Sequence, residues 1–341
     1  MPKHPTIKDL AKAAGVSTAT VDRVLNSRTS VRLATTERVL KAASDIGYHG
    51  ANLIRMRFEE ARPKRHLAFL LQRSNDQFYQ QLATAIQQAV LEPCSYNFTC
   101  EIRFMEEVSP SSIAQQLRSL SGVDGVGIVA LENSQVTQEL EKLTDRGIPV
   151  INLLSDMATL KKSGFVGWDS RKVGRTAAWT IHRLSKKTGS IGILLGSHRY
   201  LGQQEAETSF INYFREIDSD FTVLPTLLNL DDDRLTAQAT SELLEANPDL
   251  VGIYNAGGGR AGMIDTLRNE ATERELVVVC QELTGETKSA LLDGVIDLVI
   301  ATPTKEIARE TIKQFQTVFN DLHSDRAETR LPADLYISEN V

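Results

Sequence analysis

The sequence predicts a small helical domain followed by a large α/β body with parallel sheets. Two observations lead to this fold class. Near the amino terminus, apolar residues recur at helical spacing in three short segments, whereas from residue 66 onward short apolar runs alternate with helical stretches. Such alternation is typical of parallel sheets with helices on both faces, and it predicts ligand sites at the carboxyl ends of the strands.

The amino-terminal segments have the start and stop signals of a helix-turn-helix. Thr6 and Asp9 have the spacing of a capping box, so a helix should begin there. Gly15 stands where a chain leaving a helix often needs a positive φ, and Ser17 can cap the next helix. A third helix is expected from about residue 34 to residue 46. A helix-turn-helix presents its second helix to the major groove of DNA.

The distribution of charge favours this interpretation over an ordinary helical bundle attached to an enzyme. Residues 1–65 contain 13 Lys and Arg against 6 Asp and Glu, whereas the rest of the chain contains 25 against 38. A basic module in front of an acidic body indicates that one end of the protein meets phosphates and the other does not.

The residues TIKDLAKAAGVSTATVDRVLN at 6–26, with VLKAASDIGY at 39–48, resemble the DNA-binding head of the lactose-repressor (LacI-type) family of bacterial transcription regulators. The resemblance implies a DNA-binding domain over residues 1–48. It implies base contacts from Thr18, Ala19 and Arg23, and phosphate contacts from Thr6, Ser17, Thr20 and Asn26. Arg23 is expected to discriminate most, because a guanidinium can bind O6 and N7 of guanine together.

Asp22 departs from this family pattern, which usually has Ser at that position. A carboxylate beside phosphates is repelled unless it pairs with a base amine or orients a neighbouring group. We therefore expect Asp22 to orient Arg23 or Arg28 within the chain.

Residues 49–65 resemble the hinge that follows the head in the same family, with Gly50, Ala51 and Arg57 departing from its usual sequence. Arg57 can enter a narrow minor groove as a cation, and Met56 or Phe58 can supply an apolar wedge. An ordinary basic linker without groove insertion stays open as the alternative.

The body, residues 66–341, resembles a periplasmic-binding-protein-like sensor of two lobes. The strands are expected at 66–71, 98–104, 125–131, 149–154, 190–195, 222–227, 250–254, 276–280 and 298–301, with a last short strand near 335–337. Helices are expected at 79–91, 111–120, 135–146, 171–186, 204–216 and 233–246. The resemblance implies three crossings between the lobes, which we place near 156–163, 281–287 and 317–324.

Polar and aromatic side chains gather in the loops that follow successive strands, including Gln72–Tyr79 and Ser155-Asp156. The effector is expected to lie between the lobes. The candidates to bind it are Asn75, Gln77, Phe78, Tyr79, Asp156, Trp168, Asp169, His198, Arg199, Asn255 and Glu282. Planar hydrogen-bonding groups beside aromatic faces suit a neutral polyhydroxylated ligand, a sugar or a polyol. Asn255 is followed by Ala256-Gly257 rather than by the usual Asp, so a sugar held differently or another polar metabolite stays open.

One rival motif points to a dinucleotide. Gly257, Gly259 and Gly262 form G-x-G-x-x-G after an expected strand. A dinucleotide site also requires an acidic residue about twenty positions after the glycine motif. Glu275 and Glu282 lie on either side of that position, and neither is clearly the required residue. The glycines therefore favour a tight turn or a close approach of the backbone to the effector, and no cofactor is expected.

Other catalytic and metal-binding signals are weak. The six His residues are scattered, and Cys94, Cys100 and Cys280 form no C-x-x-C pair, which suits a reducing cytosol. No apolar run approaches the length of a membrane span, and no export signal is evident. No metal, no catalytic residue and a cytoplasmic location are therefore expected.

Together these features predict a DNA-binding transcription regulator that acts as a repressor and whose affinity for operator DNA is controlled by a small polar effector. A homodimer is expected, and a higher oligomer stays open. The protein is not expected to be an enzyme. The alternatives are a solute-binding protein and an NAD(P)-dependent enzyme with an accessory DNA-binding head.

Overall fold

The computed structural model describes residues 5–26, 31, 33–157, 164–271, 275–321 and 327–341, except for the side chains of residues 33, 57, 58, 60 and 61. The chain divides into two compact units. The first contains the residues up to His66 together with Glu92–Thr99, and the second contains Leu67–Leu91 together with Cys100–Val341.

Four helices form the first unit: α1 (Ile7–Ala14), α2 (Thr18–Asn26), α3 (Leu33–Asp45) and α4 (Ala51–Ala61). The three helices of the predicted helix-turn-helix head are confirmed. Leu10, Val21 and Val39 contribute fully buried side chains from α1, α2 and α3, and Ile54 of α4 joins the same core. Because Ile54 is buried there, the helix of the hinge region packs on the head.

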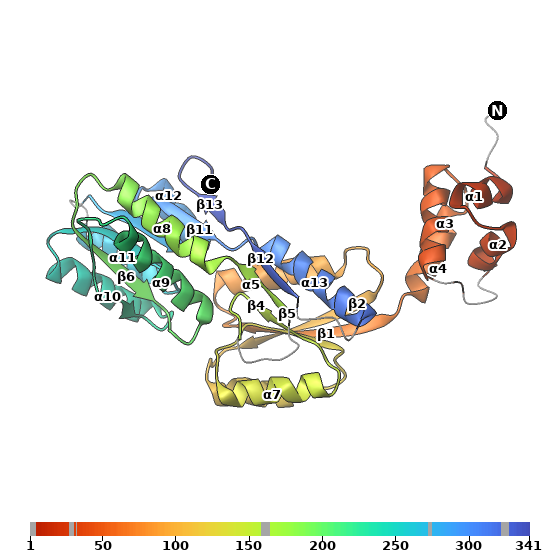
Figure 1. The fold of residues 1–341 in the computed structure, drawn as a ribbon, viewed down its shortest axis with the longest axis horizontal. Helices are drawn as coiled ribbons and strands as arrows, with labels where there is room; N and C mark the ends of the chain where they lie inside the picture. Colours follow the sequence, from red (N-terminus) through yellow and green to blue (C-terminus); the bar gives the residue numbers. More distant parts are fainter. Residues whose placement is uncertain (1–4, 27–30, 32, 158–163, 272–274, 322–326) are drawn as a thin grey trace. The chain divides into compact units, whose positions relative to one another are not determined.

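Two parallel sheets form the body, as the strand–helix alternation predicts (Figure 1). The first sheet has the order β12 (Glu328–Leu331), β5 (Gly164–Trp168), β4 (Val150–Leu153), β3 (Gly125–Ile128), β1 (Lys64–Gln72) and β2 (Asn97–Met105). The second has the order β13 (Asp334–Tyr336), β11 (Leu298–Ala301), β10 (Val277–Gln281), β9 (Leu250–Asn255), β6 (Ser190–Leu195) and β7 (Thr222–Val223), with β8 (Leu227–Leu228) also paired to β6. β13 pairs with β11 in the antiparallel direction, whereas β1 with β3, β3 with β4, β4 with β5 and β5 with β12 are parallel, as are the pairs of β6, β9, β10 and β11 with their other neighbours in the second sheet.

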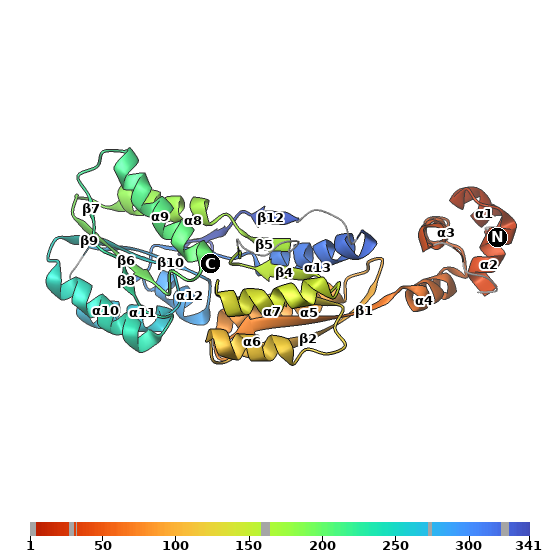
Figure 2. The same cartoon turned by 60° about the horizontal axis from the view of Figure 1, so that its bottom comes forward.

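Helices cover both faces of each sheet. Those of the first sheet are α5 (Gln77–Val90), α6 (Pro110–Arg118), α7 (Ser134–Asp145) and α13 (Thr304–Asn320). Those of the second are α8 (Ser170–Leu184), α9 (Leu201–Glu216), α10 (Asp233–Ala246), α11 (Arg260–Glu270) and α12 (Gly285–Leu292). Figure 2 shows α8 and α9 on one face of the second sheet and α10, α11 and α12 on the other, and each face has its own apolar core.

Three connections join the lobes, at positions that differ from the sequence-based ones. The chain leaves the first sheet after Trp168, returns to it between Ala301 and Thr304, and leaves it again between Leu331 and Asp334. The crossings placed near 156–163, 281–287 and 317–324 are therefore corrected, and residues 158–163 and 322–324 lie outside the described residues. The first and third crossings were misplaced because β5 and β12 were not predicted as strands, and the second was misplaced because β11 belongs to the second sheet.

The sequences of the misassigned strands explain the errors. β5 reads GFVGW, in which a Cβ on Gly164 would lie 2.4 Å from Oε1 of Gln314, so close packing rather than strand propensity selects glycine. β12 reads ETRL and has no buried residue. The single strand expected at 222–227 is split into β7 and β8, because Pro225 has no N–H to donate to a ladder. None of the described helices combines the length and apolar character that a bilayer crossing requires.

Candidate functional site

The caps expected in the head are present. The Thr6 hydroxyl accepts from the backbone N–H of Asp9, and the Asp9 carboxylate accepts in return from the backbone N–H of Thr6 at 2.8 Å. Gly15 ends α1 with φ 63°, and the Ser17 hydroxyl accepts from the backbone N–H of Thr20 at 3.1 Å. These contacts fix the turn between α1 and α2, so the orientation of α2 within the head is set by local chemistry.

The second helix has one buried and one exposed face. Val21 and Val24 are buried, whereas Thr18, Ala19 and Arg23 are exposed. A short exposed face with one long cation suits insertion into a groove lined by base edges and phosphates.

Asp22 orients Asn26. Its Oδ1 accepts a hydrogen bond of 2.7 Å from Nδ2 of Asn26, one turn further along α2. The expected partner Arg28 lies outside the described residues, and within α2 Asp22 forms its side-chain hydrogen bond with Asn26 rather than with Arg23. Among the other phosphate candidates, the hydroxyls of Ser17 and Thr20 lie 2.9 Å apart at the start of α2.

The hinge region forms a helix, α4, over Ala51–Ala61. Met56 has an exposed fraction of 59%, so an apolar side chain is available on this helix. The side chains of Arg57 and Phe58 lie outside the described residues.

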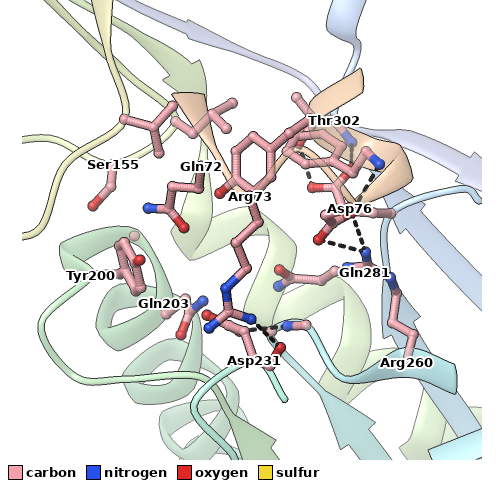
Figure 3. A pocket seen from close by; sticks show the side chains of 18 of the residues that line it. Gln72, Arg73, Asp76, Ser155, Tyr200, Gln203, Asp231, Arg260, Gln281 and Thr302 are labelled. Atoms are coloured by element: carbon pink, nitrogen blue, oxygen red, sulfur yellow. Dashed lines mark hydrogen bonds and ion pairs between the residues drawn. The ribbon is translucent and has the colours of Figure 1, made fainter. Parts of the chain in front are cut away.

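The body contains a pocket at the carboxyl ends of strands from both sheets (Figure 3). The first sheet contributes Gln72, Ser155 and Trp168, and the second contributes Gln281 and Thr302. Its cavity volume is about 100 Å³.

Two arginines cross between the lobes in this pocket. Arg73, which follows β1, donates to the backbone carbonyls of Asp231 and Leu230 at 2.6 and 3.1 Å. Arg260, at the start of α11, donates to both carboxylate oxygens of Asp76 at 3.0 and 3.2 Å. Asp76 also caps α5 by accepting from the backbone N–H of Phe78. The two lobes are therefore tied together by the same groups that line the pocket.

Glu282 is a buried carboxyl group at the wall of the pocket. One oxygen accepts from the hydroxyl of Thr302 at 2.7 Å and the other from its backbone N–H at 3.0 Å. Burial raises the pKa of Glu282 to about 7, because the hydrogen bonds from Thr302 and the charge of Arg260 only partly offset the loss of solvation. Burial also raises the pKa of Tyr79 and Tyr200, so both phenols remain protonated.

The glycine-rich loop after β9 holds a carboxylate of the protein itself. The backbone N–H of Gly258 donates to Oδ1 of Asp231 at 2.6 Å. A Cβ on Gly257 or Gly258 would lie only 2.7 Å from Asp231, and one on Gly196 would lie 2.1 Å from it. The amide that a dinucleotide fingerprint would offer to a pyrophosphate thus binds Asp231, and the glycines are explained by close packing.

Strained backbone concentrates at this pocket. Among the described residues, six that are not glycine have a positive φ, and five of them line the pocket or contact a lining residue: Arg73, Leu154, Leu230, Asp231 and Glu282. Left-handed backbone at such residues costs free energy and is typical of ligand clamps and switches.

The structure separates the predicted effector residues into three groups. Phe78, Tyr79, Trp168 and Glu282 line the pocket. Asn75 and Gln77 line an adjoining polar opening that shares Arg73, Asp76, Asp231 and Arg260 with it. Asp156, Asp169, His198, Arg199 and Asn255 are not among the lining residues of either.

Members of the third group have structural partners. Asp169 caps α8, and Nε2 of His198 lies 2.8 Å from a carboxylate oxygen of Glu207. The Asn255 side chain donates to the carbonyl of Gly258 and accepts from the N–H of Gly257, so it shapes the glycine-rich loop. Asp156 accepts from the backbone N–H of Met157.

Several lining residues were not among the predicted ones, notably Gln72, Arg73, Ser155, Tyr200, Gln203, Asp231 and Arg260. Gln72, Arg73 and Ser155 stand in strand-end loops that the sequence singled out, so the strand-end rule could have included them. Asp231 follows the short strand β8, and the same rule applied there would have found it. Tyr200, Gln203 and Arg260 lie at helix starts. Tyr200 directly follows the predicted pair His198 and Arg199, and Arg260 lies inside the glycine-rich motif, so adjacency to those segments was the available signal.

Two family models match the chain. Residues 67–321 match the family described as periplasmic binding protein domain, and residues 6–50 match bacterial regulatory proteins of the lacI family. Together these matches cover the head and the body up to residue 321.

Among the relatives, an uncharacterized HTH-type transcriptional regulator of Streptomyces limosus is 25% identical over 63% of this chain and 60% of its own length. The ribose operon repressor of Bacillus subtilis is 25% identical over 65% of this chain and 64% of its own length. The matches thus span less than two thirds of these relatives. A solute-binding protein of an ABC transporter from Agrobacterium vitis, solved with α-D-tagatopyranose, is 18% identical with a TM-score of 0.72 over 81% of this chain and 95% of its own, which shows the shared fold.

Proposed function

Since the chain belongs to the periplasmic-binding-protein domain family and carries the helix-turn-helix head of the lacI family of bacterial regulators, we propose that it is a transcriptional repressor controlled by a small polar effector. The relatives named above are regulators of transcription rather than enzymes. The observation that carries the proposal is one chain with a basic helix-turn-helix and a pocket between two α/β lobes.

In the proposed complex, two heads of a homodimer read two half-sites of a nearly palindromic operator. Arg23 binds guanine, and Thr18 and Ala19 make shorter base contacts. Thr6, Ser17, Thr20 and Asn26 hold phosphates, and Met56 and Arg57 of α4 act at the minor groove. The exposure of Thr18, Ala19, Arg23 and Met56 supports these roles.

The proposed effector site is the pocket of Figure 3. Its polar groups and its aromatic side chains Phe78, Tyr79 and Trp168 suit a sugar or a polyol. The name of the Bacillus relative and the sugar bound by the Agrobacterium protein agree with that class. A ligand that favours one lobe arrangement changes operator affinity, and operator DNA must change ligand affinity by the same factor.

An unbiased selection of duplex DNA with the full chain tests the regulator. We expect one enriched motif with two half-sites, and an affinity that falls as salt rises because phosphate contacts release counterions. Arg23→Ala should weaken binding to the selected duplex by about 1–3 kcal/mol and relax the preference at one position per half-site.

Arg38→Ala is the matched control, since Arg38 is an exposed arginine on α3. It removes the same charge from the head, so it should change the salt dependence without changing the preferred sequence. If the full chain enriches no duplex, with or without metabolites, the proposal that the protein regulates transcription is rejected. The hypothesis of a solute-binding protein would then remain.

A further inference from the structure

We propose that the outer face of helix α8 is a docking surface for an acidic segment of another protein. The surface is a line of four residues, called the basic stripe from here on: Lys172, Arg175, Trp179 and Arg183. None of the four lines the pocket or its polar opening. The basic stripe is therefore a second site, and its partner is distinct from the effector.

The charge of this segment departs from that of the rest of the body. Residues 170–187 contain six Lys and Arg and no Asp or Glu, whereas residues 66–341 as a whole contain 25 against 38. One of the six, Lys186, is paired with Glu275 at 2.8 Å. A run of cations on an otherwise acidic body creates a local positive potential, which steers an acidic partner to that one place.

Helical spacing puts the four residues on one side of α8. They follow one another at intervals of three, four and four positions, and residues at these intervals are neighbours on a helix surface. The opposite side of the helix is buried, because Val173, Ala177 and Ile181 belong to the apolar core under α8. Figure 2 shows α8 covering one face of the second sheet, so the basic stripe faces solvent.

Trp179 is the apolar centre of the basic stripe. Its exposed fraction is 54%, and that of the nearby Leu184 is 53%. Arg175 and Arg183 stand about one helical turn before and after it. Trp and Arg are among the residue types that most often carry the binding free energy of protein interfaces. An exposed indole between two guanidinium groups offers a partner an apolar anchor and charge-assisted hydrogen bonds together.

Acidic neighbours neutralise only part of the charge. A carboxylate oxygen of Glu216 on α9 lies 2.8 Å from Arg175, and one of Asp169 lies 3.5 Å from Lys172. Exposed ion pairs of this kind contribute little free energy, so an incoming carboxylate can replace them. Arg183 is exposed and forms no ion pair with any residue that the structure describes.

The composition of the surface favours a protein segment over two other partners. A second copy of this chain docking through the same face would set one basic stripe against another, and their like charges would repel. A DNA duplex presents phosphates and buries the faces of its bases, so it offers Trp179 little apolar contact. Its dense negative charge would also be repelled by Asp169 and Glu216 beside the stripe.

The length of α8 sets the size of the segment. The helix has 15 residues and is therefore about 22 Å long, a distance that about seven extended residues span. A segment of that length with spaced carboxylates and a large apolar side chain matches both the cations and the indole of the basic stripe.

The test uses the full chain and three short synthetic peptides labelled with fluorescein. The first peptide combines Asp and Glu with Leu and Phe, the second has Asn and Gln in place of the acids, and the third keeps the acids and has Gly in place of Leu and Phe. Fluorescence anisotropy measures their affinities. We expect saturable binding of the first peptide, binding about tenfold weaker or more for the other two, and a fall in affinity as salt rises.

Two substitutions locate the binding on α8. Arg183→Glu and Trp179→Ala should each weaken binding of the first peptide about tenfold or more, with little change in melting temperature because both side chains are exposed. The matched controls are Arg234→Glu and Leu292→Ala, an exposed arginine on α10 and an exposed apolar residue on α12, both on the opposite face of the second sheet. Their affinities should stay within about twofold of the parent.

Four results would each overturn the proposal. The first peptide may show no saturable binding, or Arg183→Glu and Arg234→Glu may weaken it equally, which would reveal a general effect of charge. A random duplex whose binding falls about tenfold in Arg183→Glu would assign the basic stripe to nucleic acid. A change of oligomeric state in Trp179→Ala, measured by sedimentation velocity, would assign it to a second copy of the chain.

Discussion

Arg73 donates a hydrogen bond of 2.6 Å to the backbone carbonyl of Asp231, a residue 158 positions further along the chain. The same guanidinium binds the carbonyl of Leu230, so one side chain from the first lobe holds a loop of the second. Arg73, Leu230 and Asp231 all have positive φ, and the contact therefore joins two strained segments. Its position makes it a candidate control point for lobe closure.

Removing this contact should loosen the body. Arg73→Met keeps the length of the side chain but loses both hydrogen bonds, so we expect a loss of about 1–3 kcal/mol in the free energy of unfolding. Amide hydrogen exchange should accelerate in the loop at 229–232. The control is Lys172→Met, because Lys172 is an exposed cation that forms an ion pair with Asp169 on the same helix start. If the amides of this loop exchange at the same rate in Arg73→Met and in Lys172→Met, Arg73 does not hold the loop in place.

Glu282 should make stability depend on pH. Its pKa is about 7 in the folded protein against an ordinary value of 4.5, so the folded state binds the proton more tightly. The contribution to stability is therefore fully present below about pH 4.5 and is lost as pH rises to about 7, with a magnitude on the order of 3 kcal/mol.

Glu282→Gln isolates this effect. The amide imitates the protonated carboxyl, since its oxygen can accept from the Thr302 N–H while its nitrogen donates to the Thr302 hydroxyl. Denaturant unfolding at pH 5 and pH 8 measures the difference between the variant and the parent. We expect the variant to gain stability relative to the parent at pH 8. A difference that does not change with pH would show that Glu282 does not titrate in this range.

The sequence predicted well where the signal is local. Thr6 with Asp9, Gly15 and Ser17 define caps that depend on neighbours within four residues, and each forms as expected. The buried strand Leu67–Leu71 was also evident, because a run of apolar residues at that length is typical of a parallel strand.

The sequence predicted poorly where distant segments decide the structure. A side chain larger than that of glycine at position 164 would collide with Gln314. The hydrogen-bonding groups of the Asn255 side chain are used by the backbone of Gly257 and Gly258, so they do not face an effector. Neither relation has a signature within a short window. The strand-end rule located loops of the pocket, but which side chain faces the cavity depends on strain and hydrogen bonds that only the folded chain shows.

Gly258 gives a test of the close-packed loop. A Cβ there would lie 2.7 Å from the Cβ of Asp231, so Gly258→Ala should force the loop apart and cost about 1–3 kcal/mol in the free energy of unfolding. The control is Gly285→Ala, where the nearest atom is Oε1 of Gln77 at 3.6 Å, and stability should change by less than about 0.5 kcal/mol.

The same loop can be examined with a dinucleotide. Because Asp231 already accepts from the Gly258 N–H, excess NAD or NADP should leave the melting temperature of the parent unchanged. A clear rise that Gly258→Ala abolishes would restore the dinucleotide interpretation.

Asp22 provides the sharpest test of the head, because two substitutions separate its charge from its hydrogen bond. Asp22→Asn removes the charge and keeps an oxygen that can accept from Asn26, whereas Asp22→Ser removes the charge and the reach needed for the 2.7 Å contact. Loss of a carboxylate from a face that meets phosphates should strengthen binding of both variants to random duplexes, most strongly at low salt.

The two variants should differ in selectivity. Asn26 is proposed to hold a phosphate and so to set the register of Arg23 against the bases. In Asp22→Asn the orientation of Asn26 is retained, and the ratio of affinities for selected and random duplexes should stay close to that of the parent. In Asp22→Ser this ratio should fall several-fold, because phosphate contacts no longer hold α2 in one register. Fluorescence anisotropy at several salt concentrations measures both affinities. Equal ratios in the two variants would mean that Asp22 acts on DNA through its charge alone, and the contact with Asn26 would then have no part in reading the operator.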